Sequence, residues 1–557
     1  MPDLAPTRRE FVSRLAWGGV GAAALGGPGR PRRALADTKY PDWIAPSTKT
    51  PKRGGTLRTI INPEPPSLVL GISPLIPTGT VGSKIYQSLL SYSFDLKPYP
   101  VLAKSWTASP DGRVYTFTLQ DKVTWHDGTP FSADDVVFSI KRAQDKASDI
   151  RVYANAMGEP KKLDNLSVEF NLKEVDPIFL QHANAIYIMS KAWCEENKVT
   201  RPLDFTNKEE SYTSLHANGT GPYRLVSRAP DIKTVLERNP TYWGKIEGNV
   251  QSVVYTPIKS PATRVAALIS GELDFVLDPP PTDVERLRST PGLKVIDGPE
   301  NRIVFIGMDQ GRDELLYSSV KGKNPFKDLR VRRALYQAID IETIKTKLMN
   351  GQSLPTGALV PSPLASFNDP EIEKRLPYDL EAAKKLMADA GYKDGFEVTL
   401  DCPNNRYIND ERICQTLASM WARLNLKVRV NAMPRVTYFP KLDKLDTSLF
   451  MYGWGGSITD AETTFTPIYR NRGEKGVGFY NYGNYKDDKL DALAASSSVE
   501  ADPAKRKALI KQVFLAQAEA THYIPLHRQI IPWAARANVE VVHRADNWVE
   551  TRWVVVK

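Results

Sequence analysis

The segment LFMYGWGGSITD, at 449–460, combines aromatic rings, glycines and an acid in a way that suits ligand binding. Its apolar first half predicts a strand, and its glycines predict a loop directly after that strand. Ligand sites in α/β proteins lie beyond the carboxyl ends of strands. We therefore expect a binding loop here, with a plain tight turn as the alternative. The candidate contacts are Tyr452, Trp454, Gly455, Gly456, Ser457 and Asp460.

Motifs of the common catalytic sites are missing from the chain. It has no G-x-S-x-G elbow, no GxxxxGK[ST] phosphate loop, no HExxH motif and no paired CxxC motifs. The six histidines are scattered, and His522 and His527 flank a proline at a spacing that suits metal ligation poorly. We expect no enzyme, no metal site and no cofactor. Cys402 and Cys414 are expected to be free core thiols, with a disulfide as the alternative.

The composition is that of a soluble globular protein of several domains. The chain has 557 residues, of which 41% are hydrophobic and 25% are charged, and this length corresponds to about three domains. Three cysteines are too few to staple a fold of this size. The net charge is +10, but bases and acids are interspersed, so a solvated mixed surface is favoured over a nucleic-acid footprint.

The first residues have the pattern of an export signal. The twin arginines Arg8 and Arg9 precede the short apolar run LAWGGVGAAALGG, and small residues around Ala36 offer a cleavage site. We expect a signal peptide at 1–36, read by the twin-arginine translocase, and a mature chain in the bacterial periplasm. An uncleaved signal anchor is the alternative. Residues 37–53, rich in Pro, Lys and Thr, are expected to form an N-terminal strap.

Strands and helices alternate along the rest of the chain, which predicts an α/β fold. In the first half we expect strands at 54–61 and 113–119, a helix at 81–92, and a helix that Ser132 caps with Asp135 three residues later. Further strands are predicted at SVEFNL, VVYTPI, EVTLDC and KVRVNAM, and further helices at LRVRRALYQAI, LEAAKKLMADAG, DERICQTLASMWARL and AKRKALIKQVFLAQAEA.

Several of these segments together resemble the large solute-binding proteins of peptide-type ABC importers, the dipeptide- and oligopeptide-binding family (family 5). They occur in the order typical of the family and span almost the whole mature chain. The segments are AKSW (103–106), WHDGTPFSADDVVFS (125–139), GTGPYRL (219–225), ERNPTYWG (237–244), NPFKDLRVRRALYQAID (324–340), YDLEAAKKLMADAGY (378–392) and IPLH (524–527).

The resemblance implies a two-lobed periplasmic-binding-protein fold of type II, in its large three-domain form, whose lobes close over a ligand. Carried onto this chain, lobe one comprises 54–85, 219–299 and 525–557. An extra domain inserted into lobe one comprises 86–218, and lobe two comprises 300–524.

The resemblance also implies two ligand positions. Dipeptide-binding members hold the peptide carboxylate with an arginine after a lobe-two strand, and the matching segment DCPNNRYIND supplies Arg406, followed by Tyr407. The same members hold the peptide α-amine with an aspartate three residues after a tryptophan. Here Ser457 stands three residues after Trp454, and Asp460 is the next acid along the loop. A ligand with a free α-amine is therefore in question.

The resemblance implies that the protein captures a short peptide or peptide-like carboxylate and delivers it to the membrane permease of an ABC importer. We expect it to act as a monomer without nucleic acid. Alternatives are a non-peptide solute (an opine, a sugar conjugate, a glutathione-like molecule or a metal chelate), a secreted peptide hydrolase, and a chaperone or cell-surface interaction role.

Overall fold

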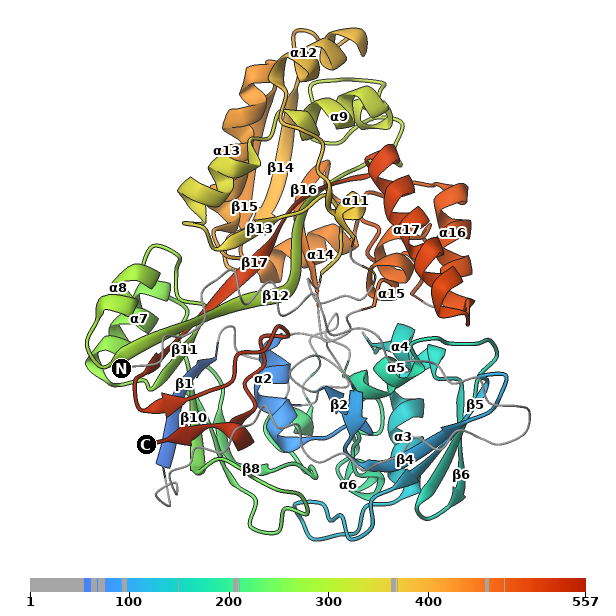
Figure 1. Cartoon of the computed structure of the whole chain (residues 1–557), viewed down its shortest axis with the longest axis vertical. Coiled ribbons are helices and arrows are strands. Elements are labelled where there is room, and N and C mark those ends of the chain that lie inside the picture. Colours follow the sequence, from blue (N-terminus) through green and yellow to red (C-terminus); the bar gives the residue numbers. More distant parts are fainter. Residues whose placement is uncertain are drawn as a thin grey trace, which may run out of the picture.

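A large mixed sheet connects the two lobes of the molecule (Figure 1). Its strand order is β15-β14-β16-β12-β17-β11-β1-β10-β9-β8, and β13 pairs with β17 away from this path. The long strands β12 (Leu293–Met308) and β17 (Tyr523–Arg536) run antiparallel from the lower lobe into the upper one (Figure 1). A computed structural model describes residues 55–61, 68, 76–92, 98–148, 150–203, 209, 211–361, 367, 369–455, 460–474 and 476–557.

The first lobe is built around β1, the strand predicted at 54–61. The last three residues of this strand, Thr59, Ile60 and Ile61, are all buried, which is typical of a strand inside a sheet, and β1 lies between two parallel neighbours, β10 and β11. Its core draws on distant parts of the chain, from Leu57 to Val554. The strands of this lobe are β1 (Gly55–Ile61), β8 (Tyr223–Ala229), β9 (Lys233–Arg238), β10 (Val250–Pro257), β11 (Phe275–Leu277), β18 (Val539–Glu540) and β19 (Val555–Val556). Its helices are α2 (Ile76–Ile85), α7 (Pro261–Ser270) and α8 (Val284–Ser289).

The predicted helix at 81–92 is wrong in its second half. Helix α2 ends at Ile85, and Leu90–Tyr92 forms the short strand β2, which pairs with β3 (Pro98–Pro100). The carbonyl of Ile85, which would accept from Leu89 in a longer helix, accepts instead from the backbone N–H of Gly221 at 2.8 Å. The apolar residues Val81, Ile85, Tyr86, Leu89 and Leu90 are buried all the same.

The inserted domain has a separate antiparallel sheet of order β4-β5-β7-β6 and a separate core. The predicted cap of α3 is confirmed: the backbone N–H of Ser132 donates to the Asp135 carboxylate at 2.9 Å. Cys194 and its apolar neighbours in the later part of 86–218 pack into the first-lobe core instead. The strands are β4 (Ala103–Ala108), β5 (Val114–Leu119), β6 (Glu159–Asp164) and β7 (Ser167–Asn171), and the helices are α3 (Ala133–Ala143), α4 (Arg151–Ala156), α5 (Phe179–Ala185) and α6 (Lys191–Glu196).

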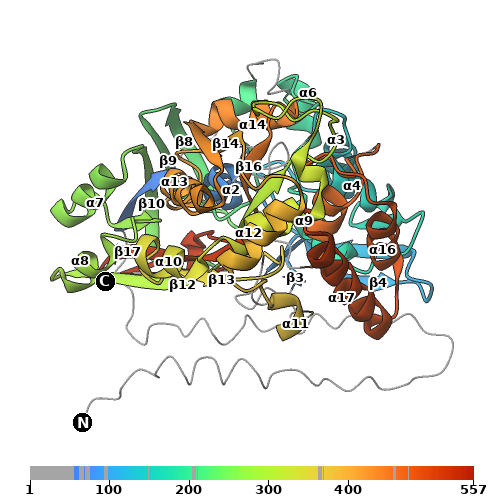
Figure 2. The same ribbon diagram turned by 90° about the horizontal axis from the view of Figure 1, so that it is seen from above.

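The second lobe surrounds the other end of the large sheet, with α13 on one side and α16 and α17 on the other (Figure 1, Figure 2). Strands β14 and β15 are parallel and α13 connects them, as the strand–helix alternation predicted. The strands here are β13 (Ser353–Pro355), β14 (Glu397–Pro403), β15 (Lys427–Met433) and β16 (Leu449–Gly455). The helices are α9 (Leu329–Gln337), α10 (Ile341–Thr343), α11 (Pro370–Glu373), α12 (Leu380–Asp389), α13 (Asp410–Trp421), α14 (Arg435–Asp443), α15 (Glu462–Thr464), α16 (Asp488–Val499) and α17 (Pro503–Ala520).

Among the residues that the structure describes, no helix has both the length and the apolar character needed to cross a membrane. The proposed signal residues Arg8, Arg9 and Ala36, and the strap at 37–53, lie outside the described residues.

Candidate ligand-binding site

A cavity of about 400 Å³ lies between the two lobes. The first lobe contributes the carboxyl end of β1, at Ile60 and Ile61, and the segment 277–281 after β11. The second lobe contributes the segment 404–412, which follows β14 and enters α13. The cavity thus lies where the ends of strands from both lobes meet, which is a common position for ligand sites in α/β folds.

Asp410 fixes the backbone of the second-lobe segment. Its Oδ2 accepts from the backbone N–H groups of Arg406 at 2.9 Å and Tyr407 at 3.0 Å. Burial raises the pKa of Asp410 to about 6, and these backbone donors oppose that rise. The backbone N–H of Ile408 donates to Oε1 of Gln529 at 3.1 Å, which ties the segment to β17. The segment is therefore held before a ligand arrives.

Arg406 lines the cavity with a guanidinium that the protein does not neutralise. The group is half-buried and lies 5.3 Å from the centre of the Tyr407 ring. It has no hydrogen bond or ion pair with any residue that the structure describes. Burial, followed by the nearby positive charge of Arg302, lowers the pKa of Arg406. An anion from outside the protein is the natural partner for such a group.

Tyr407 connects this segment to β16. Its hydroxyl accepts from the Gly453 N–H at 2.8 Å and donates to the Gly453 carbonyl at 3.3 Å. A Cβ at Gly453 would come within 2.5 Å of the Tyr407 ring, so only glycine permits this approach. Burial raises the pKa of the Tyr407 hydroxyl. The Tyr407 hydroxyl thus already has hydrogen-bond partners within the protein, and its ring forms part of the cavity wall.

A buried ion pair lies at the base of the cavity, where the long strand β12 passes from one lobe to the other. Arg302 Nε donates to Glu300 Oε1 at 3.0 Å, and both side chains are almost fully buried. The Gln529 amide donates to the other Glu300 oxygen at 2.6 Å. Because Gln529 also accepts from Ile408, the network joins β12 and β17 to the Arg406 segment.

The aromatic residues of the 449–460 segment do not line this cavity. Tyr452 is 6% exposed and belongs to a second-lobe core, and the Trp454 indole N–H donates to the Thr463 carbonyl at 2.6 Å. A Cβ at Gly455 would lie 1.7 Å from the Asn301 carbonyl oxygen, so only glycine lets β16 approach β12 this closely. Gly456 and Ser457 lie outside the described residues.

Asp460 has its charge balanced within the second lobe. Both of its carboxylate oxygens accept from the Arg506 guanidinium, at 2.8 and 2.6 Å, and both side chains are about nine-tenths buried. Asp460 is also absent from the described lining of the cavity. This geometry gives Asp460 a structural partner in place of a ligand amine.

Replacing Asp460 with asparagine is therefore expected to lower stability. Removing one member of a buried pair leaves the other charge uncompensated and costs about 3–5 kcal/mol. Urea unfolding monitored by circular dichroism would measure the loss, and the double variant Asp460→Asn/Arg506→Met is expected to regain part of it. An Asp460→Asn protein of unchanged stability that loses a preference for free-amine peptides would contradict this structural role.

Residues 97–476 match the family model "Bacterial extracellular solute-binding proteins, family 5 Middle". The chain belongs to this family. It is 26% identical over 504 residues to Heme-binding protein A of Haemophilus influenzae, covering 83% of this chain and 85% of that protein. It is 26% identical over 463 residues to Di/tripeptide-binding protein 3 of Pseudomonas aeruginosa, covering 77% of this chain and 83% of that protein.

Solved structures of similar proteins share the two-lobed fold. The periplasmic binding protein DppA of Helicobacter pylori, in complex with the peptide STSA, matches with a TM-score of 0.78 at 22% identity, covering 91% of this chain and 98% of that one. The dipeptide-binding protein of Pseudoalteromonas sp. SM9913, in complex with Met-Leu, matches with a TM-score of 0.79 at 21% identity, covering 90% and 100%. The expected fold class is thereby confirmed.

Several residues that line the cavity of this family 5 protein could not be predicted from any motif in the sequence. Arg264 in α7, Asp278 after β11 and Arg435 at the start of α14 line the cavity together with Arg406. Burial, followed by the Glu300 charge, raises the pKa of Asp278 to about 6. Only the folded chain brings these residues together, because no local motif marks any of them.

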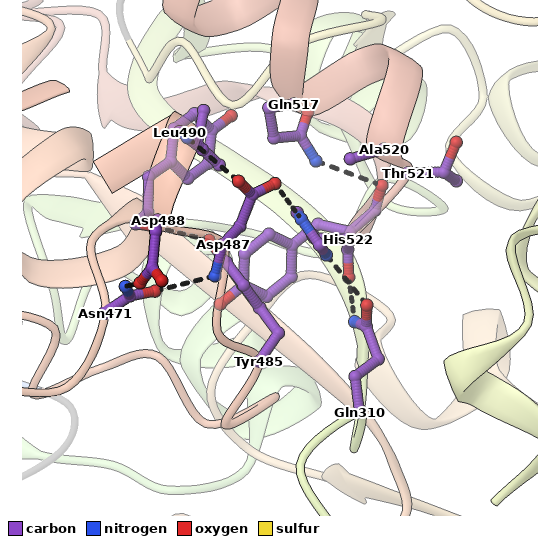
Figure 3. Close-up of polar contacts among 12 residues, drawn as sticks. Gln310, Asn471, Tyr485, Asp487, Asp488, Leu490, Gln517, Ala520, Thr521 and His522 are labelled. Atoms are coloured by element: carbon purple, nitrogen blue, oxygen red, sulfur yellow. Dashed lines mark hydrogen bonds and ion pairs between the residues drawn. The ribbon is translucent and has the colours of Figure 1, made fainter. Parts of the chain in front are cut away.

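His522 and His527, which flank Pro525, do not line the inter-lobe cavity. His522 lies 2.8 Å from Gln310 Oε1 and 3.1 Å from Asp487 Oδ2, and its ring stacks on Tyr485 (Figure 3). Burial lowers the pKa of His522 to about 4 and that of His527 to about 3. In the part of the chain that the structure describes, no three His, Cys, Asp or Glu side chains are grouped to hold a metal. Cys402 and Cys414 are buried free thiols, as predicted.

Proposed function

We propose that this protein is the periplasmic solute receptor of an ABC importer and that it captures a short peptide or peptide-like carboxylate between its lobes. The observation that carries the proposal is the Arg406 guanidinium, which faces the inter-lobe cavity without a protein partner. A planar guanidinium binds a carboxylate through two parallel hydrogen bonds. Relatives named for dipeptide and glutathione binding support this class of ligand.

Capture by closing lobes also explains why the site draws on both of them. A ligand that bridges the 277–281 and 404–412 segments binds only the closed arrangement and therefore stabilises it. The closed protein, acting as a monomer, would then dock on the membrane permease and release the ligand there.

Mass spectrometry of the small molecules released by denaturing the purified protein tests the ligand class. A family of short peptides, each with a free carboxylate, is the expected result. A neutral sugar or an uncharged metal complex as the released ligand would overturn the proposal, and cleaved products of an added peptide mixture would indicate a hydrolase.

The export route is the second part of the proposal. The pair Arg8 and Arg9, the short apolar run and the small residues before Asp37 together support recognition by the twin-arginine translocase and cleavage near Ala36. Replacing both arginines with lysine is expected to leave uncleaved precursor in the cytoplasm, because the translocase reads the arginine pair. Fractionation and immunoblotting would measure this, with Arg14→Lys as the control. Normal periplasmic levels of the double variant would contradict the route.

A further inference from the structure

The inter-lobe cavity carries an excess of positive charge. Six basic and four acidic side chains are among its described lining residues, which gives a formal net charge of +2. Two of these charges cancel within the protein, because Arg302 and Glu300 form an ion pair. Two further cavity acids already accept hydrogen bonds from neutral groups of the protein. Asp410 accepts from backbone N–H groups, and Glu411 accepts from the Gln415 amide at 3.1 Å.

On the second lobe, the positive charges of Arg406 and Arg435 lie in the cavity without an ion-pair partner among the described residues. Neither guanidinium has a hydrogen bond or an ion pair with any described residue. Arg435 is positioned by its own backbone, whose N–H donates to Asn405 Oδ1 at 2.9 Å. Burial, followed by the Arg406 charge, lowers the pKa of Arg435 to about 10, so the two cations lie close enough to repel each other. An anion between them would relieve this repulsion.

On the first lobe, the positive charge that faces the cavity is that of Arg264 in α7. This side chain is only 6% exposed, and its Nε is buried without a hydrogen-bond partner among the described residues. The charge that acts on it is Asp278, which is not within ion-pair distance and accepts from the Asn547 amide at 3.3 Å. A buried donor without a partner destabilises the protein, and a ligand acceptor would remove this cost.

We propose that the cavity selects ligands with two anionic groups, one bound by Arg406 and Arg435 on lobe two and the other by Arg264 on lobe one. The inference rests on the proposed function, and it narrows the ligand from any short peptide to an acidic peptide or an amide dicarboxylate. An amide dicarboxylate carries a charge of −2, which matches the +2 charge of the cavity lining, and an acidic peptide supplies the same two carboxylates with a net charge of −1. It also favours lobe closure, since closure without it brings unbalanced cations of the two lobes toward one another.

Calorimetric titration with the dipeptides Ala-Glu and Ala-Gln tests the proposal, because these probes differ by one negative charge at nearly equal size. We expect Ala-Glu to bind wild type at least tenfold more tightly than Ala-Gln. The variant Arg264→Gln is expected to abolish this preference, because it weakens Ala-Glu binding at least tenfold. Lys259→Gln, at the exposed rim, is the matched control and is expected to keep the preference.

The remaining outcomes separate the two proposals. If both dipeptides bind equally, or Ala-Gln binds more tightly, the dianion inference is overturned and the peptide proposal stands. If neither dipeptide binds but glutarate does, and Arg264→Gln weakens glutarate binding at least tenfold, the dianion inference stands and the peptide proposal fails. If none of the three probes binds, both are overturned. The melting temperature of each variant, compared with wild type, shows that a lost affinity does not reflect unfolding.

Discussion

Replacing Arg406 with alanine is expected to weaken the binding of a carboxylate-bearing peptide by roughly 30-fold or more. Truncating one member of a buried charge pair costs about 2–5 kcal/mol, and 1.4 kcal/mol corresponds to about tenfold in affinity. The loss is expected for binding alone. Because Arg406 has no hydrogen bond or ion pair with a described residue, its removal is expected to leave the unfolding free energy unchanged or slightly raised.

Isothermal titration of wild type and variant would measure this effect. Arg412→Ala is the matched control, because Arg412 is an exposed arginine on the same segment and lines the same cavity. Its substitution is expected to change affinity by only a few-fold, since charges open to solvent are screened. Equal losses for the two variants would show that Arg406 contributes only to the general charge of the cleft.

The second large effect is expected on stability, at the ion pair of Glu300 and Arg302, where β12 passes between the lobes. Glu300→Ala leaves the buried Arg302 without its partner and is expected to cost about 3–5 kcal/mol. It also removes the acceptor of the Gln529 amide, so the tie between β17 and the Arg406 segment loosens. Ligand affinity is therefore expected to fall together with stability.

Urea unfolding and peptide titration on the same Glu300→Ala protein would measure both losses. Glu237→Ala breaks an exposed ion pair with Arg224 and is expected to cost at most about 1 kcal/mol. The double variant Glu300→Leu/Arg302→Met removes both charges and is expected to recover much of the stability. A Glu300→Ala protein as stable as Glu237→Ala would show that the fold does not depend on this pair.

Local elements were predictable from the sequence where local forces decide them. The strands β14 and β15 and the helices α9, α12, α13 and α17 lie where alternation or helical period placed them. The cap of α3 was predictable for the same reason, since Ser132 and Asp135 are three residues apart. The error at 81–92 arose because a long-range bond from Gly221 ends α2, and no local pattern carries that information.

The site was only partly predictable. The family resemblance identified Arg406 and Tyr407, which line the cavity, whereas the composition of the 449–460 segment favoured a loop whose described aromatic residues do not line it. Asp460 forms an ion pair with Arg506, which is 46 residues away in sequence, so no local pattern could predict this pairing. Arg264 and Asp278 reach the cavity from the other lobe because β12 and β17 bring distant segments together.

Small-angle scattering during a peptide titration tests the central claim, capture between two closing lobes, most directly. A ligand that bridges the lobes selects the closed form, so the radius of gyration is expected to fall in step with calorimetric saturation. The Arg406→Ala protein is expected to need a correspondingly higher peptide concentration for the same compaction. A peptide that binds tightly to wild type and leaves the scattering profile unchanged would contradict the claim.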